Sequence, residues 1–164
     1  NQFLNIFGID SINWLGSSAL ALPSVCIVGI WKNVGYFMVI YIAAIMDIPR
    51  DLYEAARVDG ASKTRQFWHI TLPMLRPITF LVVTLGTIWS FQVFDLVYMM
   101  TGGGPGKATV TLVSIIYNSA FRDYNMGYAS AMAMFLFGTI VVVSALQQLL
   151  LRDRSNRRRG GSEK

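Results

Sequence analysis

The chain has 164 residues, of which 54% are apolar and only 14% are charged, and its formal net charge is +5. With a mean hydropathy of +0.47, this composition excludes an ordinary soluble domain and favours a membrane protein. The single cysteine, Cys26, lies in an apolar block without a second cysteine to form a disulfide or share a metal, so we interpret it as a small hydrophobic residue.

The apolar residues form long uncharged blocks rather than narrow amphipathic stripes. Four long apolar blocks without Asp, Glu, Lys or Arg are 11–31, 33–46, 77–94 and 124–151. Because about 20 helical residues cross the hydrocarbon core of a bilayer, the blocks predict an all-α, polytopic membrane protein. Three transmembrane helices are expected, at 23–46, 75–99 and 127–150.

The first residues, 1–22, are expected to be an extracytoplasmic or interfacial lead-in that leaves an earlier helix. The sequence starts at Asn1, without an initiating methionine or the basic region of a signal peptide. We therefore expect the chain to be a fragment of a longer protein.

Basic residues are distributed unevenly among the segments that connect the predicted spans. Five lie between residues 47 and 76 and six follow residue 151, whereas only Lys107 and Arg122 lie in segment 100–126. The positive-inside rule therefore predicts that loop 47–74 and the basic tail 151–164 are cytoplasmic, and that 100–126 is an extracytoplasmic loop with a short helix. Anionic lipid explains the tail's charge better than nucleic acid does, so no nucleic acid partner is expected.

The cytoplasmic loop has the pattern of two short helices. Pro49 suits a first helical turn and Gly60 suits the left-handed position just after a helix end, so a helix is predicted over 49–59. Ser62 can cap a second helix that continues to about residue 70. Leu72, which precedes Pro73, is expected to leave the helical region, and this predicts a bend there.

The spacing of this loop resembles that of a transporter family. Glu54-Ala55-Ala56 is followed by Asp59-Gly60 and then by Ile70-Thr71-Leu72-Pro73. The pattern is similar to the cytoplasmic loop in the inner-membrane subunits of binding-protein-dependent ABC importers. The resemblance implies that this coupling-helix pair docks in a cleft of a separate ATP-hydrolysing subunit. The residues that it assigns to this contact are Glu54, Ala55, Ala56, Asp59 and Gly60. The alternative is an ordinary amphipathic loop that merely connects two spans.

A second segment narrows the resemblance to one branch of the family. Phe94-Asp95 followed by Thr101-Gly102-Gly103-Gly104-Pro105 is similar to the carbohydrate permeases, which include those for maltose, multiple sugars and glycerol 3-phosphate. The resemblance implies the C-terminal part of a six-helix-type permease core in a bacterial or archaeal plasma (inner) membrane, with the C-terminus cytoplasmic. It also implies a sugar substrate, two ATP-binding subunits, a second permease subunit and an extracytoplasmic solute-binding protein.

Aromatic and polar residues within the apolar blocks are candidates for the substrate pathway. Aromatic rings suit the apolar faces of a sugar, and amides and hydroxyls suit its hydroxyl groups. The candidates are Asn33, Tyr36, Trp89, Ser90 and Gln92. Each could instead be an interfacial anchor. The chain departs from the maltose-type pattern at Lys32 and Val93, so the resemblance carries over the location of the site and not the sugar.

Two charged residues, Lys32 and Asp95, lie within predicted spans and away from their cytoplasmic ends. Lys32 and Asp95 are costly in a bilayer, by about 2.5 to 3.5 kcal/mol each on insertion scales. Lys32 could pair with Asp95, extend to the outer surface, or bind an anionic group such as a sugar phosphate.

Other functions lack their motifs. The run Gly104-Pro105-Gly106-Lys107 is no phosphate-binding loop, because Thr101 and Ala108 occupy positions that require glycine and a hydroxyl residue. No residues have the spacing of metal ligands or of a catalytic set, so we expect no cofactor and no enzymatic activity. The alternatives that remain are an importer for a peptide, polyamine or phosphonate and, in another class, a membrane-embedded enzyme.

Overall fold

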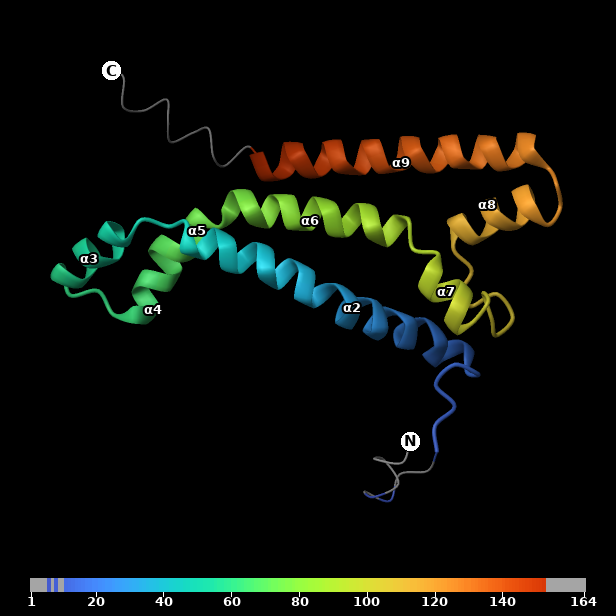
Figure 1. Cartoon of the computed structure of the whole chain (residues 1–164), viewed down its shortest axis with the longest axis horizontal. Coiled ribbons are helices and arrows are strands. Elements are labelled where there is room, and N and C mark those ends of the chain that lie inside the picture. The colour runs from blue at the N-terminus through green and yellow to red at the C-terminus, as the bar shows by residue number, and fades with distance from the viewer. Residues whose placement is uncertain (1–5, 7, 9–10, 153–164) are drawn as a thin grey trace. The chain divides into compact units, whose positions relative to one another are not determined.

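The computed structural model describes residues 6, 8 and 11–152 and divides into two compact units. Unit 1 consists of Asn1–Lys32 and Phe91–Thr139, and unit 2 consists of Asn33–Ser90 and Ile140–Lys164. Every regular element in the described part is a helix, which confirms the predicted all-α fold class (Figure 1). Much of the predicted lead-in and nearly all of the predicted basic tail lie outside the described residues.

Two of the helices are long and apolar enough to cross a membrane. Helix α2 runs over Ser18–Met46 and helix α9 over Met126–Arg152, with 29 and 27 residues. Both exceed the roughly 20 residues that a bilayer core requires. Few of their side chains are buried within the chain, as expected for helices that face lipid or neighbouring subunits.

The predicted crossing at 75–99 is not one continuous helix. Helix α6 covers Arg76–Phe91, a non-helical break follows, and helix α7 covers Asp95–Met100. Sixteen residues of helix span about 24 Å, which is less than the hydrocarbon core of about 30 Å. The segment Lys63–Met74 and α6 meet the criteria for a span only as a pair, with a bend of 61° between them. A crossing here stays a prediction.

The bend lies later than the predicted position at Leu72, and that prediction was wrong. Leu72 is helical and begins helix α5, Leu72–Met74. It follows a π-helical turn, η1 (Phe67–Thr71), in which the Leu72 amide donates to the Phe67 carbonyl. The wider π turn gives the Pro73 ring room inside the helix.

The chain bends instead at Leu75, next to the start of α6. Pro77 is the second residue of α6, where a missing N–H leaves no intrahelical bond unmade. The Thr79 amide and hydroxyl both donate to the Leu75 carbonyl, at 2.8 and 2.9 Å, and these bonds fix the new helix start.

The first loop helix forms within the predicted range 49–59, and the second begins after Ser62 as predicted, but its α-helical part ends at Gln66, where η1 begins. Helix α3 covers Arg50–Val58 and helix α4 covers Lys63–Gln66 (Figure 1). Gly60 has a φ of 73°, and the Ala61 amide donates to the Ala56 carbonyl at 2.9 Å, which is the geometry of a glycine-terminated helix. The Ser62 hydroxyl caps α4 by accepting from the Arg65 amide.

In unit 1, hydrogen bonds within the loop between α7 and α8 fix its conformation. Helix α8, Leu112–Phe121, follows the glycine-rich loop after α7. The Thr109 hydroxyl is buried and donates to the Gly104 carbonyl at 2.8 Å, and it lies 2.7 Å from the Thr101 hydroxyl. The loop with the Thr-x-Gly-Gly-Pro pattern is therefore held in one conformation by its own side chains.

Candidate functional site

Helix α3 carries most of the residues assigned to ATPase coupling, and they divide between two faces. By helical spacing, positions 50, 53, 54 and 57 lie on one face, and positions 52, 55, 56 and 59 lie opposite. We call the second set, Leu52, Ala55, Ala56 and Asp59, the alanine ridge. Glu54 therefore belongs to the other face. None of the residues of α3 is buried, and Val58 is 89% exposed, so the helix offers its surface to a partner.

Side-chain contacts attach α3 to the segment that leads into α6. The Tyr53 hydroxyl lies 2.8 Å from the Thr71 hydroxyl, and Thr71 is buried. The buried Gln66 amide donates to the Ala61 carbonyl at 2.9 Å. The first contact joins α3 to η1, and the second joins α4 to the turn after α3.

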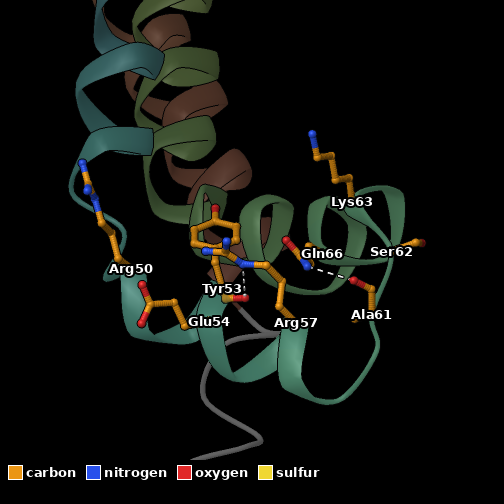
Figure 2. A pocket seen from close by; sticks show the side chains of 8 residues that line it. All are labelled: Arg50, Tyr53, Glu54, Arg57, Ala61, Ser62, Lys63 and Gln66. Carbon is orange, nitrogen blue, oxygen red and sulfur yellow. Dashed lines mark hydrogen bonds between the residues drawn. The ribbon is translucent and has the colours of Figure 1, made fainter.

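An open groove of about 710 Å³ separates α3 from α4 (Figure 2). We call it the α3–α4 groove. Three of its side chains are cationic and one is a carboxylate. Its lining residues are Arg50, Tyr53, Glu54, Arg57, Ala61, Ser62, Lys63 and Gln66.

The structure brings two of the five substrate-pathway candidates together in unit 2. The rings of Tyr36 and Trp89 are 5.1 Å apart, and Phe37 joins them at 5.3 Å from Trp89. Tyr36 is 52% exposed and Trp89 36%, so this aromatic cluster has free surface. The prediction missed Phe37, because a phenylalanine in an apolar span carries no polar group that distinguishes it from a lipid-facing residue.

The other three candidates lie on α2, on α6 and in the break after α6. Asn33 lies one turn before Tyr36 on α2. The Ser90 hydroxyl donates to the Gly86 carbonyl of its own helix at 2.8 Å, so its proton is already used. Gln92 belongs to unit 1 and lies in the break after α6.

The charged residues Lys32 and Asp95 form an ion pair within unit 1. The ammonium nitrogen of Lys32 lies 2.5 Å from a carboxylate oxygen of Asp95, and the pair joins α2 to the first residue of α7. The two side chains are 53% and 64% exposed. Of the three interpretations of Lys32, the structure supports pairing.

A polar contact between α6 and α9 was not predicted. The Gln147 amide donates to the Thr87 hydroxyl at 2.7 Å, and the Thr87 proton goes to the Val83 carbonyl. Among the described residues, the Gln147 side-chain oxygen and the Ser144 hydroxyl are buried without a partner. The signal that could have revealed the contact was an amide within the uncharged block 124–151.

Two helices long and apolar enough to cross a membrane, α2 and α9, together with the exposed two-helix loop after α2, define a polytopic helical membrane protein. Residues 3–156 match the family model described as the binding-protein-dependent transport system inner membrane component. The chain belongs to this family, whose members are transport components of the inner membrane.

Several relatives have names that state a transported solute. The chain is 40% identical to the sulfoquinovosyl glycerol transport system permease protein SmoG of Agrobacterium fabrum, over 94% of this chain and 50% of that protein. It is 40% identical to the trehalose/maltose transport system permease protein MalF of Thermococcus litoralis, over 88% of this chain and 48% of that protein. The chain thus spans about half the length of the curated relatives it matches.

A solved structure shares the fold. The chain aligns with a TM-score of 0.84 and 24% identity to a crystal structure of a bacterial ABC transporter involved in the import of the acidic polysaccharide alginate. The alignment covers 95% of this chain and 55% of that one.

Proposed function

We propose that the chain is part of the permease subunit of an ATP-driven sugar importer. It forms part of the translocation pathway and couples that pathway to ATPase subunits on separate chains. The observation that carries the proposal is helix α3, an exposed helix that ends just before Gly60 and contacts Thr71 through Tyr53. Family membership and the names of the relatives support it.

The proposed coupling is mechanical. When two ATPase subunits close around ATP, they displace the alanine ridge that is seated in one of them. The small side chains of Ala55 and Ala56 let the partner backbone approach closely. The Tyr53–Thr71 contact then transfers the displacement to η1 and, across the bend at Leu75, to α6. Rigid-body motion of this kind alternates access to the pathway between the two sides of the membrane.

The distribution of basic residues supports the proposed orientation of the chain in the membrane. The loop with α3 and α4 and the C-terminal tail face the cytoplasm, because most of the chain's basic residues lie in them. The loop at 101–105 faces outward, where an extracytoplasmic solute-binding protein docks. A second permease subunit completes the pathway.

The substrate class is supported by the aromatic cluster. The partly exposed rings of Tyr36 and Trp89 offer apolar faces to a sugar ring, and Asn33 and Ser90 supply polar groups in the same unit. Gln92 is a further polar candidate, in unit 1. Lys32 is paired with Asp95, so in this conformation its charge is balanced within the chain.

Uptake into vesicles tests the proposal. The complete transporter, reconstituted with its binding protein, is expected to accumulate at least one labelled mono-, di- or oligosaccharide when ATP is supplied, and none without ATP. Uptake of only peptides, polyamines or phosphonates from the same panel would contradict the sugar assignment.

A further inference from the structure

Four aromatic side chains form a continuous row on two neighbouring helices of unit 1 (Figure 1). Phe94, the N-cap of α7, and Tyr98 are four residues apart, as are Tyr117 and Phe121 on α8. The ring centre of Tyr117 lies 4.9 Å from that of Phe94 and 5.2 Å from that of Phe121. The ring centre of Tyr98 lies 5.1 Å from that of Phe94. We call these four residues the α7–α8 aromatic row.

The row stands on a rigid part of unit 1. Val97 is 1% exposed and Ala120 is 7% exposed, so each of the two helices buries a side chain next to a residue of the row. The Thr111 hydroxyl donates to the Val93 carbonyl at 3.1 Å, which ties the start of α8 to the residue before Phe94. A ligand that binds to side chains already fixed in position loses little free energy to their ordering.

The rings at the two ends of the row have free surface. Tyr98 is 40% exposed and Phe121 is 61% exposed, whereas Phe94 and Tyr117 between them are half-buried. Aromatic faces are apolar, and a pyranose ring offers a matching face of C–H groups. The row therefore suits the rings of a sugar.

An exposed ion pair lies directly beside the row. Asp95 follows Phe94, and the side chains of Lys32 and Asp95 are both more than half exposed. Charged side chains of a membrane protein face protein or water rather than acyl chains, so the pair favours a water-accessible surface at this end of the row. A carboxylate and an ammonium group also accept from and donate to sugar hydroxyls.

The row adjoins one of the candidates for the substrate pathway. Gln92 precedes Phe94 by two residues and belongs to the same unit. Helices α7 and α8 flank the loop at 101–105, which under the proposed function faces the solute-binding protein. The row thus occupies the two helices next to the proposed docking loop and begins beside Gln92.

We propose that the α7–α8 aromatic row is a second sugar-binding surface, on which rings of the solute stack before they reach Gln92. The inference rests on the proposed function for the substrate class and for the side of the membrane on which α7 and α8 lie. The row is separate from the aromatic cluster of Tyr36, Phe37 and Trp89, which belongs to unit 2. A sugar released by the binding protein is held at this surface, which raises its concentration at the start of the pathway.

Saturation-transfer NMR of the complete transporter in detergent, without its binding protein, tests the surface. The probes are maltotriose and cellotriose, because their glucose rings present apolar C–H faces in differently linked chains. Irradiation of the aromatic protons of the protein is expected to saturate the C–H protons of the sugar, and titration gives an apparent Kd. All variants are made in a Trp89→Ala background, which removes the largest ring of the cluster in unit 2.

Loss of a ring at either end of the row is expected to weaken sugar binding. Tyr98→Leu and Phe121→Leu keep apolar bulk but lose the ring, and each should raise the Kd about 5-fold, which corresponds to about 1 kcal/mol for one aromatic contact. Tyr98→Phe and Phe121→Tyr keep the ring and should keep the Kd. Tyr124→Leu is the matched control, because Tyr124 is 81% exposed in the same connecting segment but lies outside the row.

Four results would overturn the proposal. Absence of saturation transfer to both trisaccharides before any change in the row would remove the site. An unchanged Kd in both leucine variants would limit the row to packing within unit 1, and the same result with poorer membrane insertion would identify lipid as its occupant. An equal rise of the Kd in Tyr124→Leu would show a general effect of exposed aromatic rings.

The proposed function has a separate test, so the two can fail independently. Ala56→Trp, on the alanine ridge, is expected to lose transport and to keep the Kd for maltotriose. Normal transport in that variant contradicts the coupling role of α3 without affecting the row. An unchanged Kd in the leucine variants contradicts the role of the row without affecting the coupling.

Discussion

Two connecting segments of the chain bury their side chains to very different extents. In the segment that includes α7 and α8, Val97 and Thr109 are each only 1% exposed, and the rings of Phe94, Tyr98 and Tyr117 pack together. In helix α3, none of the residues is buried. The segment with α7 and α8 packs its own side chains together, whereas α3 is stabilised by the hydrogen bonds at its ends and by one contact between two hydroxyl groups. The difference is in keeping with the proposed docking of α3 on an ATPase subunit.

The largest expected effect comes from adding bulk to the alanine ridge. Ala56→Trp is expected to lower ATP-driven uptake about 100-fold, as for a loss of roughly 3 kcal/mol at a docking contact. Because Ala56 is not buried within the chain, the variant should fold and insert normally. Uptake and membrane insertion are measured together, with Ala56→Ser as the small-residue control. Wild-type uptake in Ala56→Trp would show that the exposed surface of α3 has no partner.

The exposed rings of unit 2 give the second prediction. Trp89→Ala is expected to weaken apparent sugar affinity about 10-fold, because a lost aromatic contact is worth about 1 kcal/mol or more. Uptake kinetics check this. Trp31→Ala, which removes another exposed tryptophan, is the control, and an equal loss of sugar affinity in that variant would show that the effect is one of membrane anchoring.

Gln92→Ala is expected to change the affinity or the rate of sugar uptake while ATPase binding is retained.

The end of α3 tests how much its local signals stabilise it. Gly60→Ala places a side chain at a φ of 73° and is expected to destabilise the loop by about 1 kcal/mol. Hydrogen exchange of the amides near residue 60 should quicken about 5-fold. Gly127→Ala, in the first turn of α9, is the control and should not quicken exchange of the amides around residue 127. Unchanged exchange in Gly60→Ala would mean that the turn is held by other contacts.

The smallest expected effect is at the contact between α6 and α9. A double-mutant cycle with Thr87→Val and Gln147→Leu is expected to give a coupling energy of about 0.6 kcal/mol, typical of hydrogen bonds between membrane helices. Thermal unfolding in detergent measures it. Additive effects of the two substitutions would show that the bond contributes nothing to holding these helices together.

The features that sequence predicted well are local ones. The stop at Gly60 and the cap at Ser62 depend on residues a few positions apart, so their geometry could be foreseen. The all-α class followed from the length of the uncharged blocks.

The features that sequence missed depend on backbone adjustment or on distant contacts. A π turn accommodates Pro73 and moves the bend to Leu75, and no residue type marks such a turn. The break after Phe91, at residues 92–94, contains no glycine or proline that would mark the end of a helix. The meeting of Tyr36 with Trp89 and that of Thr87 with Gln147 each require the arrangement of two helices, which periodicity does not specify.

Disulfide or bifunctional cross-linking from position 55 tests most directly whether α3 docks in an ATPase. The native cysteine is exposed, so Ala55→Cys is made in a Cys26→Ser background, with Lys107→Cys as the control in the opposite connecting segment. An adduct is expected between position 55 and the nucleotide-hydrolysing subunit, with a yield that changes when ATP is added, and no such adduct from position 107. Absence of that adduct from position 55 in a transporter that still takes up its solute would contradict docking of α3 in an ATPase.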